Sequence, residues 1–222
     1  MHKYLLEHLF GWNFKTRKSN SKGGILGHVE AFYAGVENTE RGSLHAHFEI
    51  WMMGALNPSE LHSCLKNDKE FDTRFFQYLE SIIKQDLPDN DVIIKDDYEP
   101  HIMRPPQINF SNMDDDTLSL LDTEIYKCGE KVQQHSCHEV CYKYQTNNSK
   151  CRFEFPHEII PESYFDNNTN SIFLKCLDST INYYNPYILI YCCHNHDLCC
   201  ILSEKAAKAG MFYITDYITK WN

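Results

Sequence analysis

The sequence of 222 residues contains no apolar run of about 18 residues, which excludes a conventional membrane-spanning helix. Its longest apolar run, Tyr187 to Cys193, has the length of a strand, and we expect a strand there. The N-terminus lacks the charged, apolar and small segments that follow one another in a signal peptide. Low-complexity tracts and internal repeats are also missing. These absences predict a soluble intracellular protein without a membrane partner.

Basic residues are scarce overall, and the net charge of -10 argues against a simple nucleic-acid binder. The charge is unevenly distributed, however, because the acids concentrate between Glu60 and Asp122. The first stretch of the chain has one acid, Glu7, and five cations: Lys3, Lys15, Arg17, Lys18 and Lys22. A local basic surface can therefore still contact phosphate.

Cysteine, in contrast, is plentiful, with ten residues and no sign of secretion. Clustered Cys and His in a reducing compartment are typical of metal sites. Residues 128–157 are rich in both and poor in aliphatic side chains, so we expect a small zinc module there. The four soft ligands that we predict are His135, Cys137, Cys141 and Cys151. Three further residues compete for one of the four positions, namely Cys128, His138 and His157.

A second metal site is predicted on a hairpin. Residues 25–37 and 44–53 have the composition of two strands, joined by a polar loop. Side chains alternate faces along a strand, so His45 and His47 project from one face while the apolar residues between and beside them pack beneath. Glu37 can reach the same face across the hairpin. Two imidazoles and a carboxylate suit Mg²⁺ or Mn²⁺, although two surface histidines on an edge strand are the simpler interpretation.

Helices are predicted from near Asn57, from Phe71 to Gln85, and from Ser203 to Lys220, and a short strand from Ser171 to Cys176. The stretch from Pro88 to Pro106 is acidic and interrupted by prolines, which favours a surface excursion. In the last helix Tyr213 and Tyr217 lie one turn apart, with Lys220 close to the same face. Core packing is the usual role of such a pair of tyrosines.

Four motifs resemble, in order, those of the Helitron Rep domain, a member of the HUH endonuclease superfamily. Residues 37–51 resemble E-x-Q-x-R-G-x-x-H-x-H-x-x-x-W, departing from it around Thr39 and Glu40. Residues 135–156 resemble H-x-H-x-x-x-C … C-R-F-x-F-P, with Cys137 replacing the second His. Residues 182–197 resemble the N-x-Y-N-P and N-x-D segments, and residues 213–220 resemble Y-x-x-x-Y-x-x-K, with Asp216 where the family has a basic or neutral residue.

The resemblance implies an α+β fold of the HUH endonuclease type, in which an antiparallel central sheet carries the histidines, helices flank it and a zinc-binding insertion interrupts it. The expected parts are 1–57 (hairpin and N-terminal part of the catalytic domain), 58–127 (helical and acidic insertion), 128–157 (zinc module) and 158–222 (remaining catalytic domain with the tyrosine helix). Tyr213 and Tyr217 would be nucleophiles, Lys220 would orient DNA, and Glu37, His45 and His47 would hold Mg²⁺ or Mn²⁺.

The function implied is that of a nuclear rolling-circle transposase that nicks and joins single-stranded DNA through a 5′-phosphotyrosine. Its DNA partners would be transposon ends and target. Family members carry a helicase in the same polypeptide, but no G-x-x-x-x-G-K-[ST] phosphate loop occurs in this sequence, so we expect no ATP hydrolysis. A different hypothesis is an inactive transposon remnant that binds zinc and possibly DNA.

Overall fold

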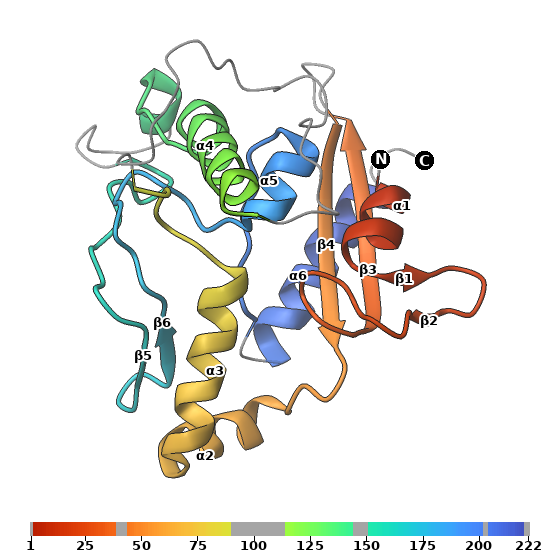
Figure 1. Ribbon diagram of the computed structural model, residues 1–222. Coiled ribbons are helices and arrows are strands. Elements are labelled where there is room, and N and C mark those ends of the chain that lie inside the picture. Colours follow the sequence, from red (N-terminus) through yellow and green to blue (C-terminus); the bar gives the residue numbers. More distant parts are fainter. Residues whose placement is uncertain (1, 39–43, 90–113, 144–150, 202–203, 220–222) are drawn as a thin grey trace. The chain divides into compact units, whose positions relative to one another are not determined.

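The computed structural model describes residues 2–38, 44–89, 114–143, 151–201 and 204–219. These residues form two compact units, residues 1–69 with 200–222 and residues 70–199. The fold class is α+β, with helices and small antiparallel sheets (Figure 1). No helix in the described ranges is both long enough and apolar enough to span a membrane.

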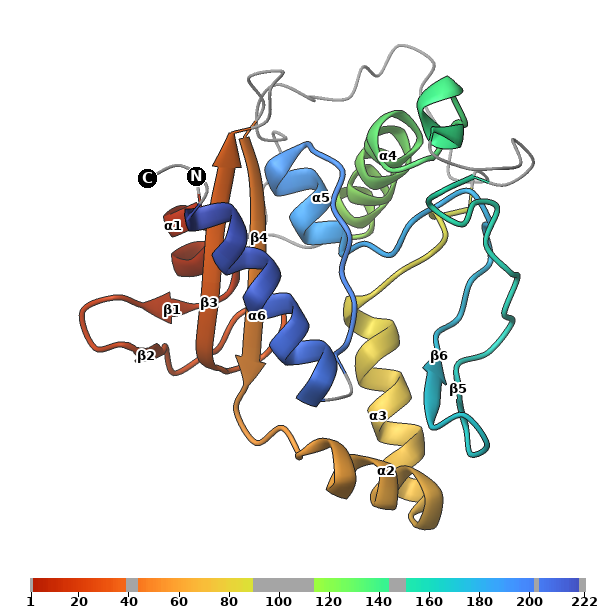
Figure 2. The same ribbon diagram turned by 180° about the vertical axis from the view of Figure 1, so that it is seen from behind.

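The first unit is organised around one long hairpin. Its elements are α1 (His2–Tyr4), η1 (Leu5–Leu9), β1 (Trp12–Asn13), β2 (Lys18–Ser19), β3 (Val29–Asn38), β4 (Leu44–Met52), α2 (Pro58–Asn67) and α6 (Glu204–Thr219). Strands β3 and β4 pair antiparallel, with one irregularity between Val29 and Ala31. We call this pair the ribbon. Helix α6 crosses one face of the ribbon, and the N-terminal segment covers the other (Figures 1 and 2).

Aromatic residues fasten the N-terminal segment to the ribbon. The rings of Phe10 and Phe48 meet edge-on with centroids 6.2 Å apart, and those of Trp12 and Phe32 at 5.3 Å. Phe48 lies on the face opposite to the histidines because side chains alternate along β4. For Phe48, the prediction that an apolar residue of this strand packs beneath His45 and His47 is therefore confirmed.

The sheets are smaller than the expected central sheet. The described residues contain three sheets of two strands each, and the ribbon is one of them. A two-stranded hairpin is marginal in water unless its faces are covered. Here α6 covers one face and Phe10, Trp12 and Phe14 cover the other, so the ribbon gains its burial from a helix and a loop rather than from further strands.

Helix α2 begins where the sequence predicts. Asn57 caps it, since the Asn57 side chain accepts a hydrogen bond from the Glu60 amide at 3.0 Å while the Glu60 carboxylate faces the Asn57 amide at 3.3 Å. Pro58 occupies the first turn, where its missing amide proton costs nothing. The helix predicted from Phe71 to Gln85 is also found, as α3 (Lys69–Ile82).

The second unit is built from α3, α4 (Asp115–Val132), the short η2 (Glu139–Tyr142), β5 (Tyr164–Asp166), β6 (Ser171–Phe173) and α5 (Pro186–Cys192). Its core lies between α4 and α5 and comprises Leu121, Ile125, Cys128, Ile181, Tyr184, Leu189 and Ile190. The short strand predicted from Ser171 is confirmed over its first three residues. Most of the predicted excursion from Pro88 to Pro106 lies outside the described residues.

The prediction of a strand from Tyr187 to Cys193 is wrong, because this run forms helix α5. Asn185 caps the helix, its side-chain oxygen accepting hydrogen bonds from the amides of Tyr187 and Ile188 at 3.0 and 3.1 Å. Pro186 sits in the first turn. A short apolar run fits a buried strand and a buried helix equally well, and here the cap and the proline decide for the helix.

A buried polar network joins the end of α4 to the segment after α5. The Gln133 side chain donates to the His196 carbonyl at 2.6 Å and accepts from the His196 amide at 3.2 Å. The Asn185 amide donates to His196 Nε2 at 2.9 Å. Burial lowers the pKa of His196 to about 4, so the ring is neutral and Nε2 is free to accept.

Candidate functional site

The ribbon places the predicted metal ligands on one face. Glu37 pairs directly with His45 across the two strands, and His47 pairs with Gly35. The Oε2 atom of Glu37 lies 3.7 Å from Nε2 of His47, and the rings of His45 and His47 have centroids 4.6 Å apart. The Glu37–His47 distance of 3.7 Å is wider than the separation of about 3.0 Å between adjacent ligand atoms around a magnesium ion.

Helix α6 brings a tyrosine to this face. The ring of Tyr213 meets that of His47 almost at right angles, with centroids 5.1 Å apart. The Tyr213 side chain is 50% exposed, so solvent still reaches it. A hydrogen bond of 2.8 Å between the hydroxyls of Tyr33 on β3 and Thr215 on α6 fixes the helix two residues beyond Tyr213. The fold thus unites side chains from β3, β4 and α6.

The close approach of α6 to the ribbon depends on Gly210. A Cβ atom at this position would collide with the carboxylate of Glu49, which lies on the same face of β4 as His47. Glu49 is 5% exposed, and burial raises its pKa. Glycine is unfavourable within a helix, so its presence here is explained by the space that Glu49 takes.

The electrostatics around His47 favour the neutral imidazole. Burial lowers the pKa of His47, the neighbouring His45 lowers it further, and Glu37 opposes both by attracting a proton to the ring. A histidine must be neutral at the nitrogen that binds a metal ion. The protonation state of this side chain is therefore compatible with a ligand role.

Two predicted residues of the tyrosine helix cannot be placed in the site. Tyr217 belongs to α6, one turn beyond Tyr213, but its side chain lies outside the described residues, as does all of Lys220. Arg41 to Ser43 of the histidine motif lie outside them too. The residues that the structure brings together are Glu37, His45, His47 and Tyr213.

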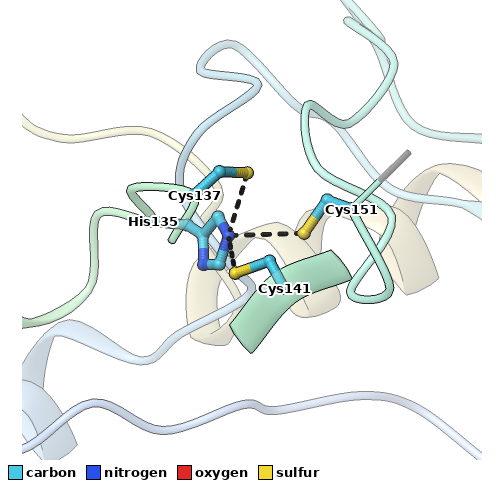
Figure 3. A group of neighbouring side chains, drawn as sticks. All are labelled: His135, Cys137, Cys141 and Cys151. Carbon is cyan, nitrogen blue, oxygen red and sulfur yellow. Dashed lines mark hydrogen bonds between the residues drawn. The ribbon is translucent and has the colours of Figure 1, made fainter. Parts of the chain in front are cut away.

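The predicted soft-metal ligands converge in the second unit (Figure 3). Within the described ranges, one group of three or more potential ligands is close enough to hold a metal ion, and it consists of His135, Cys137, Cys141 and Cys151. All four ligand atoms lie within 4.8 Å of one another. Glu37, His45 and His47 share a face but do not converge to the same degree.

The geometry of this Cys/His cluster fits a tetrahedral ion. Nε2 of His135 lies 3.4 Å from Sγ of Cys137, 3.6 Å from Sγ of Cys141 and 3.4 Å from Sγ of Cys151. Nitrogen and sulfur ligands on one tetrahedral zinc ion are about 3.5 Å apart, given the usual bond lengths. The cluster can hold a metal such as zinc.

Backbone and aromatic contacts hold the ligands in place. The His135 amide donates to the Thr180 carbonyl at 2.8 Å, and the Arg152 amide donates to the Cys141 carbonyl at 2.9 Å. The Phe155 ring stacks on the His135 ring with centroids 4.1 Å apart. The His138 amide points at Sγ of Cys141 at 3.4 Å, a contact that stabilises a thiolate.

The pKa shifts in the cluster are consistent with metal binding. Burial lowers the pKa of His135, aided by the nearby His138 and His157, which keeps its ring neutral. Burial tends to raise the pKa of Cys151, but hydrogen bonds from the backbone of Phe153 and Phe155 and from the side chains of Cys137 and Cys141 outweigh it, and the net pKa is lowered. The pKa of Cys137 is raised, chiefly by loss of solvent around its thiol. A lowered thiol pKa favours the thiolate, the form that binds zinc.

The positions of the three competing residues exclude them from the group of four ligands. Cys128 is 1% exposed and belongs to the apolar core between α4 and α5. Neither His138 nor His157 is part of the converging group. Cys137 therefore fills the position that the family pattern gives to a second histidine.

Sequence analysis missed the residues that seat α6, namely Tyr33, Glu49, Gly210 and Thr215. Only Gly210 carries a signal in the sequence, since a glycine amid the alanines of a predicted helix often marks a close approach. The other three act through pairings that the sequence does not reveal. Phe155, which stacks on His135, was also missed.

A scan of the chain against protein-family models finds no match, and neither does a search of curated proteins or of solved structures.

Proposed function

We propose that this chain is a Helitron Rep-like HUH nuclease domain, which nicks and joins single-stranded DNA in the nucleus by tyrosine chemistry. The observation that carries the proposal is the contact of Tyr213 with His47, on the ribbon face that also holds Glu37 and His45. The four residues come from motifs far apart in the sequence, and the resemblance assigns all of them to one site. Their proximity supports that assignment.

Each residue has a role that its position supports. Glu37, His45 and His47 would hold Mg²⁺ or Mn²⁺, which when bound would neutralise charge on a scissile phosphate. The hydroxyl of Tyr213 would attack phosphorus and form a tyrosine–phosphorus bond, and its proton would pass to the departing 3′-oxygen, which leaves as a 3′-hydroxyl. By resemblance, Tyr217 would supply a second nucleophile for strand transfer, and Lys220 would orient the DNA.

The Cys/His cluster is proposed as a structural zinc site. All four positions of a tetrahedron are filled by protein ligands, so no position remains for water or substrate. The segment around the cluster is fixed to Thr180 and Ser179 by the backbone amides of His135 and His157 at 2.8 Å. Zinc would therefore hold this part of the second unit together.

The test is covalent capture of DNA. Single-stranded oligonucleotides of randomised sequence, labelled at the 3′ end, are incubated with the protein and Mn²⁺ and separated under denaturing conditions. A 5′-phosphotyrosine retains the 3′ fragment, so a 3′ label should move with the protein and a 5′ label should not. The matched control is Tyr191→Phe, which removes a hydroxyl from a 39% exposed tyrosine in the second unit.

The expected result is loss of the adduct in Tyr213→Phe/Tyr217→Phe and its retention in Tyr191→Phe. Absence of any adduct in the unaltered protein, or an undiminished one in the double variant, contradicts the proposal. His45→Ala should lose the adduct as well, because the remaining ligands bind the cation poorly.

One observation favours a second candidate, a zinc-binding remnant without nuclease activity. The Cys/His cluster converges tightly, whereas Glu37, His45 and His47 do not form such a group. This candidate predicts one bound zinc ion per chain and no adduct. Binding of Mn²⁺ that is unchanged in His45→Ala would support it against the nuclease.

A further inference from the structure

We propose that the hairpin formed by residues 12–19 is a contact surface for the phosphates of single-stranded DNA. The choice of DNA as ligand rests on the proposed function. We call this segment the basic hairpin. It consists of β1, β2 and the turn between them, and it projects from the side of β3 that faces away from β4 (Figures 1 and 2).

The tip of the basic hairpin concentrates positive charge. Lys15, Arg17 and Lys18 are all exposed, and Lys22 follows closely. None of these four forms an ion pair with a carboxylate of the described residues. Unpaired surface cations are available to replace the counterions of a polyanion, which is the main source of affinity for nucleic acid.

The turn is held in a fixed shape. The Asn13 side-chain oxygen accepts hydrogen bonds from the amides of Lys15 and Thr16 at 2.9 and 3.1 Å. The Asn20 amide donates to the Gly11 carbonyl at 2.7 Å and closes the base of the hairpin. Below the turn Trp12 packs edge-on against a ring of β3. The cations therefore project from an ordered scaffold, which lowers the entropy lost on binding.

The charge of this region contrasts with that of the whole chain. Residues 1–28 hold five cations and the single acid Glu7, although the net charge of the protein is -10. A basic surface on an acidic protein attracts a polyanion selectively, since the rest of the surface repels it. The positive charge of this region therefore matches a ligand that is rich in phosphate.

Aromatic side chains beside the cations favour a single strand. Lys3 lies over the Phe14 ring with 5.7 Å between its Nζ and the centroid. Tyr4 is 60% exposed and stacks on His8. Cations interleaved with accessible rings are typical of surfaces that bind unpaired bases, because each base offers a face for stacking.

The experiment measures binding of a fluorescent oligothymidylate by anisotropy, without Mg²⁺ or Mn²⁺, over a range of salt concentrations. The variant Lys15→Gln/Arg17→Gln/Lys18→Gln removes three cations from the tip. The matched control, Arg74→Gln/Lys131→Gln/Lys175→Gln, removes three exposed cations from the second unit. We expect the tip variant to bind at least tenfold more weakly and the slope of log K against log salt to fall by about 2.

Arg17→Gly keeps the result interpretable if the triple variant folds poorly. Arg17 has a φ of 53°, a conformation that glycine adopts without strain, so this change removes one charge and keeps the turn. It should weaken binding about threefold and lower the slope by about 0.7.

Equal losses in the tip variant and the matched control, or no loss in Arg17→Gly, would overturn the proposal. Tighter binding of duplex DNA or of oligouridylate than of oligothymidylate would overturn the assignment to single-stranded DNA. The binding assay contains no divalent cation and therefore does not depend on nicking. If the protein binds the oligonucleotide here but forms no adduct with Mn²⁺, the nuclease proposal is refuted and the proposal for the basic hairpin stands.

Discussion

The Cys/His cluster takes all four ligands from the stretch between His135 and Cys151, whereas the ribbon site needs residues from β3, β4 and α6. In the cluster the donor atoms converge on one point, and backbone hydrogen bonds fix the chain around them. In the ribbon site two strands set the positions of Glu37, His45 and His47, and a helix that begins more than 150 residues later supplies Tyr213.

The two sites are held together by different interactions. Soft ligands that are close in sequence can be brought together by a metal ion alone. The free energy of metal binding is then also the free energy that folds this segment. The ribbon site is assembled by the packing of α6 against β3 and β4. Metal removal should therefore disrupt the first site, and helix displacement the second.

The largest effect is expected from loss of a cluster ligand. Cys151→Ser should abolish zinc binding, since three ligands hold the ion far less tightly than four, and structural zinc contributes about 10 kcal/mol in small modules. Native mass spectrometry should show one zinc ion in the unaltered protein and none in the variant, with an unfolding temperature lower by about 20 °C or more. Cys64→Ser, which changes a cysteine of α2 outside the cluster, is the control.

Zinc retained at full stoichiometry in Cys151→Ser would contradict the assignment of ligands. A chelator should lower the unfolding temperature of the unaltered protein to that of the variant and leave the variant unchanged. If the proposed function holds, loss of zinc should reduce adduct formation less than it reduces stability, because the cluster and the ribbon belong to different units.

A second expected effect, about 3 kcal/mol at most, concerns pH and the second unit alone. The pKa of His196 in the fold is about 4, below the ordinary value of 6.5 for the unfolded chain. Between these two values the unfolded chain binds a proton that the folded chain excludes, so stability should be complete above pH 6.5 and decline as the pH falls to 4. Urea unfolding across this range measures the decline.

His196→Gln keeps a side chain that can accept the Asn185 amide but does not titrate. The difference in unfolding free energy between the two proteins isolates the histidine, because carboxylates and zinc ligands contribute equally to both. A difference that stays constant from pH 7 to 4.5 would show that the pKa of His196 is the same in the folded and unfolded chain, contrary to its burial.

The contrast between the two sites also explains what the sequence could predict. The spacing of His135, Cys137, Cys141 and Cys151 was sufficient to identify the cluster, because ligand chemistry is local, although the choice against Cys128 needed the position of α4. The alternation of β4 placed His45 and His47 on one face correctly. The run from Tyr187 was misassigned because its periodicity does not distinguish a strand from a helix.

What the sequence could not predict is how α6 seats on the ribbon. Tyr213 and Tyr217 lie one turn apart on the same helix, and the contacts of Gly210 with Glu49 and of Thr215 with Tyr33 place the Tyr213 part of α6 over the histidines. Such pairings depend on side-chain shape over a long separation in sequence. Similarly, the expected central sheet followed from resemblance, while the strands found in the described ranges pair in twos.

Gly210→Ala tests the seating of α6, with an expected loss of about 2 kcal/mol. In an ordinary helix this change stabilises by about 1 kcal/mol, but here the new methyl group collides with the buried Glu49 carboxylate, and either this carboxylate or α6 must shift. We expect a lower unfolding free energy and, if the proposed function holds, at least tenfold less adduct. Zinc content should be unchanged.

The second variant in this test is Gly210→Ala in a Glu49→Ala background. Removing the carboxylate opens the space that the methyl group needs, so in this background Gly210→Ala should be neutral or stabilising. Equal losses in the two backgrounds would show that Glu49 does not set the position of the helix.

The smallest effect is expected from Tyr33→Phe, which removes the hydroxyl that bonds to Thr215 on α6 at 2.8 Å. The Thr215 hydroxyl is left to accept from water, and it keeps its bond to the Met211 carbonyl at 2.7 Å, so the loss should be about 1 kcal/mol or less. If packing around Gly210 holds α6 against the ribbon, Tyr33→Phe should lower adduct formation less than threefold. A loss as large as that of Gly210→Ala would instead assign the seating to this hydrogen bond. Since the two contacts lie on either side of Tyr213 along α6, comparing the two variants shows which of them brings the tyrosine to His47.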